Sequence, residues 1–248
     1  MSLKVTLLGT GVGIPQPGRS QAAILMENDQ QPLLLDCGAG TLLRLDQLGA
    51  DLEALDTVVL THLHLDHVSD LLALANARYL SDLPGLRIYG PQGTEVYFKA
   101  VQSVYPNLVK MDVTVRELLP MDSVSLKGFD IFAEEAVHSV TALAYRLEAE
   151  EKVVVYSGDT EPCPRMAALA KGADLLVHEC PFPEPFDVTN HTTPKKLGSL
   201  IKNQGVKRVV LTHLYPQAQG CEDEMASLVI ELSEAPTIVG WDLMSVVI

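Results

Sequence analysis

Three histidines and one aspartate stand within six residues of this 248-residue chain, directly after an apolar run. The run, residues 57–60, is β-branched and aliphatic and predicts a buried strand. Residues 68–80 have apolar side chains at helical spacing and predict a helix. The residues of this His-x-His-x-Asp-His motif are His62, His64, Asp66 and His67. The motif therefore occupies a turn between a strand and a helix, where side chains can converge on one point.

Imidazole nitrogens and carboxylate oxygens at this spacing indicate a metal site. They are the ligand types that suit Zn²⁺, with Mn²⁺ and Fe²⁺ as competitors. His62 and His64 are two positions apart on an extended turn and point the same way. Asp66 and His67 can face a second ion. A single histidine is commonly a core or surface residue, but three with an aspartate in this pattern favour metal binding.

Further ligand types follow other predicted strands. The remaining histidines are His138, His178, His191 and His213. His138 and His213 each stand after an apolar run that predicts a strand, and so does Asp159. Ligands at the strand ends of a packed sheet are held rigidly, as a metal site requires.

The length and residue pattern favour one domain over residues 1–248. The chain is 47% hydrophobic, which is ample for one sizeable core and short for two. Predicted strands and helices interleave, with antiparallel meanders between them, so we expect sheets with helices outside. The glycine-rich segment 9–19 predicts a loop, because Pro15 and Pro17 forbid the helix that opens a dinucleotide-binding fingerprint.

Charge and cysteine usage restrict the partners. The formal net charge of −14 repels polyanions and argues against non-specific nucleic-acid binding, although metal ions can still hold a small anionic substrate. The four cysteines form no CxxC pair, which fits reduced thiols in a cytoplasmic protein. No apolar run approaches the roughly 18 residues that span a bilayer, so we expect no membrane partner.

Several short motifs occur in a fixed order from about residue 6 to residue 215. They are Gly9-Thr10-Gly11, Asp36-Cys37-Gly38, the His-x-His-x-Asp-His motif, Gly90-Pro91-x-Gly93, His138, Ser157-Gly158-Asp159-Thr160, His178-Glu179, His191-Thr192-Thr193 and Thr212-His213. In this order the chain resembles the metallo-β-lactamase superfamily, and within it the ribonuclease Z-like branch. The resemblance implies an α/β fold of the four-layer αββα type, a hydrolytic activity and a homodimer.

The resemblance also implies two divalent metal ions, most simply Zn²⁺. One ion would be held by His62, His64 and His138, the other by Asp66, His67 and His213, with Asp159 bridging them. Such ions lie roughly 3.5–4 Å apart and hold a hydroxide between them. Asp66 would bind metal and also help to position or deprotonate the nucleophile.

A phosphodiester also needs a proton for its leaving oxygen. In ribonuclease Z-like enzymes the residue that matches His191 is the proposed donor, and the resemblance offers Glu179 as its partner. The alternative is that His191 is a cap or surface histidine. His178, on an apolar strand, is either structural or placed behind the ligands. Asp36 either holds a ligand histidine in its orientation or only stabilises its own turn.

The chain departs from the ribonuclease Z branch in one respect. Those enzymes carry an inserted basic arm that grips transfer RNA, in bacteria between the segments matching His138 and Asp159. Here only 20 residues separate these two positions, enough for a hairpin. Because a large RNA needs several phosphate contacts, we predict a phosphodiesterase acting on a small or cyclic phosphodiester, with transfer RNA less favoured. The alternatives are a transfer-RNA 3′-processing endoribonuclease, an ester or lactone hydrolase, and a non-catalytic metal-binding protein.

Overall fold

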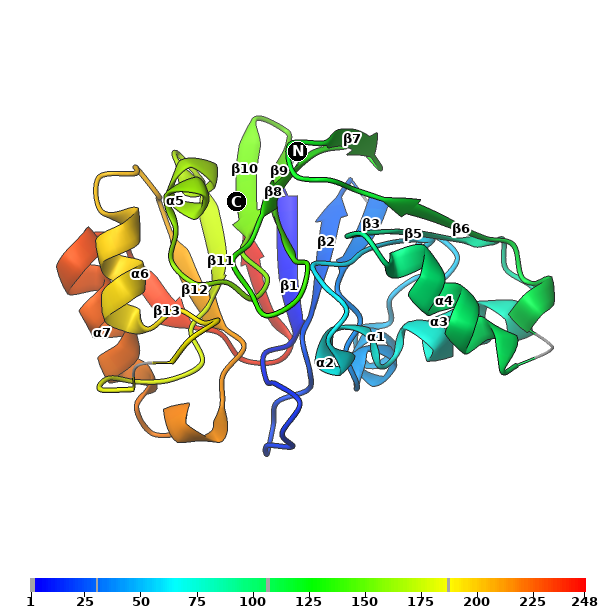
Figure 1. Cartoon of the computed structure of the whole chain (residues 1–248), viewed down its shortest axis with the longest axis horizontal. Coiled ribbons are helices and arrows are strands. Elements are labelled where there is room, and N and C mark those ends of the chain that lie inside the picture. Colours follow the sequence, from blue (N-terminus) through cyan, green and yellow to red (C-terminus); the bar gives the residue numbers. More distant parts are fainter. Residues whose placement is uncertain (1–2, 30, 106–107, 187) are drawn as a thin grey trace.

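Two sheets of seven strands each lie face to face in the computed structural model, which describes residues 3–29, 31–105, 108–186 and 188–248. Helices cover the outer face of each sheet (Figure 1). The predicted α/β fold with four αββα layers is therefore confirmed.

The first sheet has the strand order β14-β1-β2-β3-β4-β5-β6. Its strands are β1 (Leu3–Gly9), β2 (Ala23–Asn28), β3 (Gln31–Leu35), β4 (Thr57–Val59), β5 (Leu86–Gly90), β6 (Val113–Glu117) and β14 (Met244–Val247). Strands β3 to β6 pair in parallel. The helices on this side are α1 (Thr41–Leu48), α2 (Leu65–Val68), α3 (Leu71–Leu80) and α4 (Thr94–Ser103), followed by the 3₁₀ turn η1 (Leu108–Lys110).

The second sheet has the order β13-β12-β11-β10-β9-β8-β7. Its strands are β7 (Ser123–Leu126), β8 (Phe129–Glu135), β9 (Leu143–Ala149), β10 (Lys152–Tyr156), β11 (Leu175–Glu179), β12 (Val209–Thr212) and β13 (Thr237–Val239). Strands β10 to β13 pair in parallel, and β7 to β10 form an antiparallel meander. Its helices are α5 (Pro164–Ala170), α6 (Pro194–Ile201) and α7 (Glu222–Ser233), with the 3₁₀ turn η2 (Pro216–Ala218).

The core consists of three apolar layers. The middle layer joins the inner faces of both sheets, with Leu7 and Val59 from one and Tyr145 and Val177 from the other. The two outer layers lie between each sheet and its helices. Because central strands are buried on both faces, they read as continuous hydrophobic runs, which explains why residues 57–60 were recognisable as a strand.

One predicted helix differs from the observed elements. The helix predicted over 68–80 is α3, which begins only at Leu71, because the backbone N–H of Asp70 donates to the carbonyl of Cys37 and does not continue α2. The Asp70 carboxylate accepts the backbone N–H groups of Gly40 and Leu42 at the start of α1.

The strands deliver the chemical side chains to one edge of the two sheets. β4, β10 and β12 all end at this edge, where His62, Asp159 and His213 follow them. In open α/β sheets ligands likewise bind beyond the carboxyl ends of the strands. Within the residues described, no helix is both long and apolar enough to cross a bilayer.

Candidate metal centre

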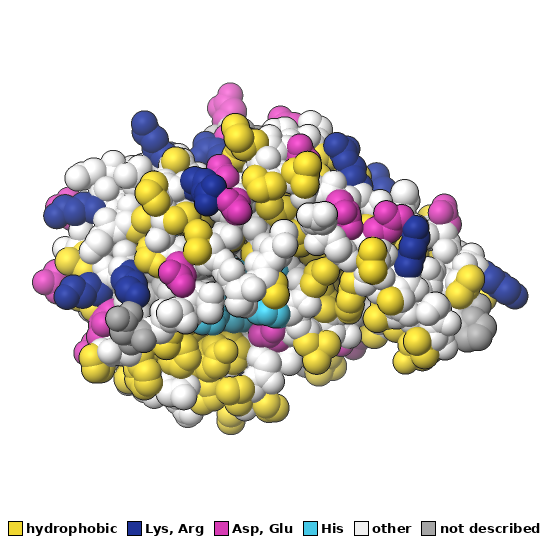
Figure 2. Space-filling model, viewed as in Figure 1, with side chains coloured by type: hydrophobic (Ala, Val, Ile, Leu, Met, Phe, Trp, Pro, Cys, Tyr) yellow, Lys and Arg dark blue, Asp and Glu magenta, His cyan; other side chains and the backbone are white. Residues whose placement is uncertain are grey.

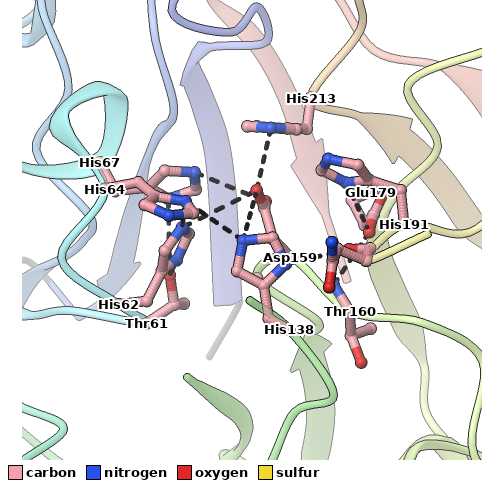
Figure 3. A network of polar contacts seen from close by, with 12 residues as sticks. Thr61, His62, His64, His67, His138, Asp159, Thr160, Glu179, His191 and His213 are labelled. Atoms are coloured by element: carbon pink, nitrogen blue, oxygen red, sulfur yellow. Dashed lines mark hydrogen bonds and ion pairs between the residues drawn. The ribbon is translucent and has the colours of Figure 1, made fainter. Parts of the chain in front are cut away.

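Imidazole side chains surround the carboxylate of Asp159 (Figure 3). They belong to His62, His64, His67, His138, His191 and His213. Asp159 follows Gly158, whose left-handed backbone (φ 54°) lies against Thr61, the residue before His62. A Cβ at position 158 would come within 2.8 Å of Thr61, so the close approach of the two strand ends requires glycine.

The first group of potential ligands contains three imidazoles and Asp159. The distance from His64 Nδ1 is 3.0 Å to His62 Nε2 and 3.1 Å to His138 Nε2. Asp159 Oδ2 lies 3.8 Å from both Nε2 atoms. Nitrogens bound tetrahedrally to zinc at about 2.0–2.1 Å lie about 3.3 Å from each other. This spacing fits one ion held by all four side chains.

The second group contains Asp66, His67 and His213, and their ligand atoms lie within 4.8 Å of one another. Asp159 is also within reach, with Oδ2 3.1 Å from His213 Nε2 and Oδ1 3.5 Å from His67 Nε2. His67 Nε2 and Asp159 Oδ1 are both buried and have no hydrogen-bond partner among the residues that the structure describes. Buried polar atoms without a partner are costly, and a cation between them would satisfy both.

The electrostatics of the two groups also suit cations. Burial lowers the pKa of His62, His64 and His138, which keeps these imidazoles neutral, as metal ligands must be. Burial alone would lower the pKa of His67, but the carboxylates of Asp159 and Asp36 raise it well above its usual value. The surroundings of His67 therefore favour a positive charge, which either a proton or a metal ion can supply.

Buried neighbours orient the imidazoles from behind. Asp36 Oδ2 accepts a hydrogen bond from His67 Nδ1 at 2.8 Å and another from the Tyr156 hydroxyl at 2.9 Å. The backbone and hydroxyl of Thr61 donate to the same carboxylate. His138 Nδ1 donates to the carbonyl of Asn190 at 2.9 Å. Of the two roles that the sequence left open for Asp36, the structure shows the contact with a predicted ligand histidine, His67. The sequence did not indicate that Tyr156 and Thr61 also bind Asp36.

Replacing Asp36 by asparagine is expected to weaken metal binding by about 10–100-fold, the usual effect of removing a partner of a ligand histidine. An amide cannot accept from His67, Tyr156 and Thr61 at once. The measurement is the dissociation constant of Zn²⁺ in competition with a chelator. Asp174→Asn is the matched control, because the side chain of Asp174 binds the backbone N–H of Val153 and the amine of Lys207, away from the metal ligands. Equal affinity of Asp36→Asn and wild type would contradict the expectation.

His191 lies beside both groups, and its ring centre is 5.5 Å from that of His138 and 5.9 Å from that of His213. Its Nδ1 is 3.2 Å from Oε1 of the fully buried Glu179, which also accepts the backbone N–H of Thr160. Burial lowers the pKa of His191, while burial and the nearby Asp159 raise the pKa of Glu179 well above its usual value. The pair suggested by the resemblance is therefore in contact.

His178 contacts none of the predicted ligands through the hydrogen bonds described. Its Nδ1 donates to the carbonyl of Glu179, and its Nε2 is buried and finds no partner within the described part of the chain. Burial lowers its pKa to about 4. These observations favour the structural role over one behind the ligands.

His178 predicts a loss of stability in acid. Between pH 6.5 and 4 the imidazole of His178 binds a proton in the unfolded chain but not in the folded chain. The free energy of unfolding therefore falls as the pH falls through this window. The loss amounts to about 3 kcal/mol at its limit. We expect His178→Gln to lose less free energy of unfolding between pH 7 and pH 5 than wild type, in urea titrations with EDTA present. Equal losses in both proteins would contradict this.

Comparison with known proteins agrees with this geometry. Residues 32–214 match the sequence profile of the Beta-lactamase superfamily domain. The chain belongs to the beta-lactamase superfamily. Ribonuclease Z of Mycobacterium avium is 30% identical over 254 positions, covering 90% of this chain and 89% of the relative. Ribonuclease Z of Methanosarcina acetivorans is 28% identical over 267 positions, covering 86% and 87%.

Solved structures share the fold of this superfamily member. The metallo-beta-lactamase fold protein YhfI from Bacillus subtilis superposes with a TM-score of 0.88 over 100% of both chains, at 25% identity. Human tRNase Z, short form, superposes with a TM-score of 0.82 over 98% of both chains, at 23% identity. The predicted resemblance to the ribonuclease Z-like branch is confirmed, and the chain is a metal-dependent hydrolase. The assignment of individual ligands and of His191 stays a prediction.

Proposed function

We propose that this hydrolase cleaves phosphodiester bonds in RNA and acts as a ribonuclease Z-type 3′-processing enzyme. The observation that carries the proposal is the hydrogen-bonded pair of His191 and Glu179 beside two groups of metal ligands. A lactone or ester hydrolase has no need for this pair. Relatives named ribonuclease Z support RNA as the substrate, more strongly than the small phosphodiester that the sequence favours.

We assign one ion to His62, His64 and His138 and a second to Asp66, His67 and His213, with Asp159 shared. The imidazole and carboxylate donors favour Zn²⁺. When bound, such ions lower the pKa of water and neutralise charge that develops on phosphate oxygens. Asp66 also accepts the backbone N–H of Gly13 at 3.0 Å, which helps to fix the orientation of its carboxylate.

In this proposal His191 gives a proton to the leaving oxygen. Glu179 binds Nδ1, so that Nε2 is the ring nitrogen left to face the substrate. Because Glu179 is itself fixed by the N–H of Thr160, the imidazole is held in one orientation. A positioned general acid of this kind contributes about 10²–10⁴-fold to the rate.

A small phosphodiester is the second candidate, and a specific observation favours it. Strands β9 and β10 are joined by a tight turn at Glu150 and Glu151, both with left-handed backbones, so no arm emerges between His138 and Asp159. The alignment with ribonuclease Z of Brevibacillus brevis spans 292 positions, more than the 248 residues of this chain, so the relative has insertions that this chain lacks. A homodimer, implied by the resemblance, could supply RNA contacts and stays a prediction.

The test is a side-by-side assay of metal-loaded wild type on precursor transfer RNA with a 3′ trailer, at several salt concentrations, and on cyclic nucleotides. Asp66→Ala with an unchanged circular dichroism spectrum is the control for contamination, and we expect it to be inactive. Specific cleavage at the 3′ end at low salt supports the RNA proposal. Turnover of cyclic nucleotides alone supports the second candidate, and turnover of neither would overturn both.

A further inference from the structure

Three aromatic side chains form a continuous cluster next to the metal centre. The ring centres of Phe182 and Tyr215 are 4.5 Å apart with an angle of 31° between the planes, and those of Phe182 and Phe186 are 5.4 Å apart at 26°. Phe186 is 42% exposed, and Phe182 and Tyr215 are partly exposed. Figure 2 shows hydrophobic side chains gathered directly beside the visible histidines.

The aromatic cluster borders the proposed proton donor. The ring centre of Tyr215 lies 6.1 Å from that of His191 and 6.4 Å from that of His213, in both cases with nearly perpendicular planes. A group stacked on the cluster would therefore sit beside His191. Since His191 serves the leaving oxygen in the proposed reaction, the aromatic cluster lies on the leaving-group side of the scissile phosphate.

The loops that carry these rings are fixed by backbone hydrogen bonds. Tyr215 N–H donates to the carbonyl of Pro181 at 3.0 Å, and this bond ties the loop after β12 to the loop after β11. Leu214 N–H donates to the carbonyl of Thr10 at 2.9 Å, and Gln16 Nε2 donates to the carbonyl of Leu214 at 2.6 Å. The cluster is thus held in place before any substrate arrives, which lowers the entropy cost of binding.

The chemistry of the cluster selects a flat, uncharged group. The rings of Phe182, Phe186 and Tyr215 offer apolar π faces and carry no formal charge. A net charge of −14 weakens any binding that depends on phosphates alone. Stacking on aromatic rings supplies affinity that does not depend on charge, because every base has a π face.

We propose that Tyr215 and Phe182, with Phe186 at the outer end, bind the nucleobase of the nucleotide on the leaving-group side of the scissile phosphate. This inference rests on the proposed cleavage of RNA. The base would stack on the aromatic cluster while its sugar oxygen faces His191. The site thereby selects nucleotides over other phosphodiesters without a basic arm.

The first test is binding, which needs no turnover. Calorimetry compares nucleoside 3′- and 5′-monophosphates with ribose 5-phosphate on metal-loaded protein. We expect Tyr215→Ala to weaken nucleotide binding by about 5- to 150-fold, with little effect on ribose phosphate, and Tyr215→Phe to retain the preference. Tyr105→Ala is the matched control, because Tyr105 is 48% exposed beyond α4. Equal binding of nucleotide and ribose phosphate by wild type would overturn the proposal.

The second test places the base relative to the scissile bond. Short RNA substrates carry one abasic residue on either the leaving-group side or the opposite side. For wild type, we expect the substrate with the abasic residue on the leaving-group side to have a lower kcat/KM than intact RNA. The factor should equal the loss that Tyr215→Ala shows on intact RNA. For Tyr215→Ala itself, kcat/KM should be the same on both substrates. If the abasic residue lowers kcat/KM of Tyr215→Ala as much as it lowers that of wild type, the proposal is overturned. If wild type cleaves no RNA but binds nucleotides through Tyr215, the stacking site stands and the proposed function fails.

Discussion

Replacing His191 by alanine is expected to lower kcat by about 10²–10⁴-fold on phosphodiesters with alkoxide leaving groups. The reason is its place beside both ligand groups, with Nδ1 bound to Glu179. The loss should shrink for p-nitrophenolate, which leaves without help from an acid. The measurement is kcat of wild type and of His191→Ala on phosphodiesters of increasing leaving-group pKa.

Metal content decides between two roles for His191. Asp159, His191 and His213 also place ligand atoms within 4.8 Å of one another, so His191 is itself near enough to bind an ion. If it is the proton donor, His191→Ala retains the metal stoichiometry of wild type. Loss of one ion, or a loss of rate that does not depend on the leaving group, would contradict the assignment as general acid.

Replacing Asp159 by alanine is expected to lower kcat/KM on the order of 10³-fold or more. Its carboxylate is within reach of both groups of potential ligands, being 3.1 Å from His213 and 3.8 Å from His62 and His138. A bound ion contributes several kcal/mol to catalysis, and each 1.36 kcal/mol is a factor of ten in rate. Metal analysis after gel filtration, together with kcat/KM, checks this expectation.

Asp66→Ala is the matched control for Asp159→Ala, because Asp66 belongs to the second group alone. We expect the Asp66 variant to lose affinity for one ion and the Asp159 variant to lose affinity for both. An Asp159 variant that keeps two ions and an activity within tenfold of wild type would show that this carboxylate is not shared.

The sequence predicts the fold and the gathering of the side chains because both depend on strong local signals. Buried strands read as apolar runs, and the ligand types follow directly after them, as His62 does after Leu60. Parallel strands place their carboxyl ends at one edge, so residues as far apart as His62 and His213 meet there.

Contacts between segments that are far apart in the chain have no such local signal in the sequence. Nothing in the sequence near Asp70 shows that its N–H bonds to Cys37, so that the helix predicted over 68–80 begins only at Leu71. The hydroxyl of Tyr156 reaches Asp36 across 120 positions of the chain. Phe182 and Tyr215 follow two neighbouring strands, but only the structure shows that their rings are in contact.

A metal titration followed by activity tests most directly whether this chain is a phosphodiesterase that needs two metal ions. Metal-depleted protein is titrated with Zn²⁺ or Mn²⁺ while hydrolysis of bis(p-nitrophenyl) phosphate and metal content are measured on the same samples. We expect turnover to appear with bound metal, to saturate at two ions per chain and to be absent from Asp159→Ala. Protein that holds two ions and hydrolyses no phosphodiester, or that hydrolyses it equally well after metal removal, would contradict this expectation.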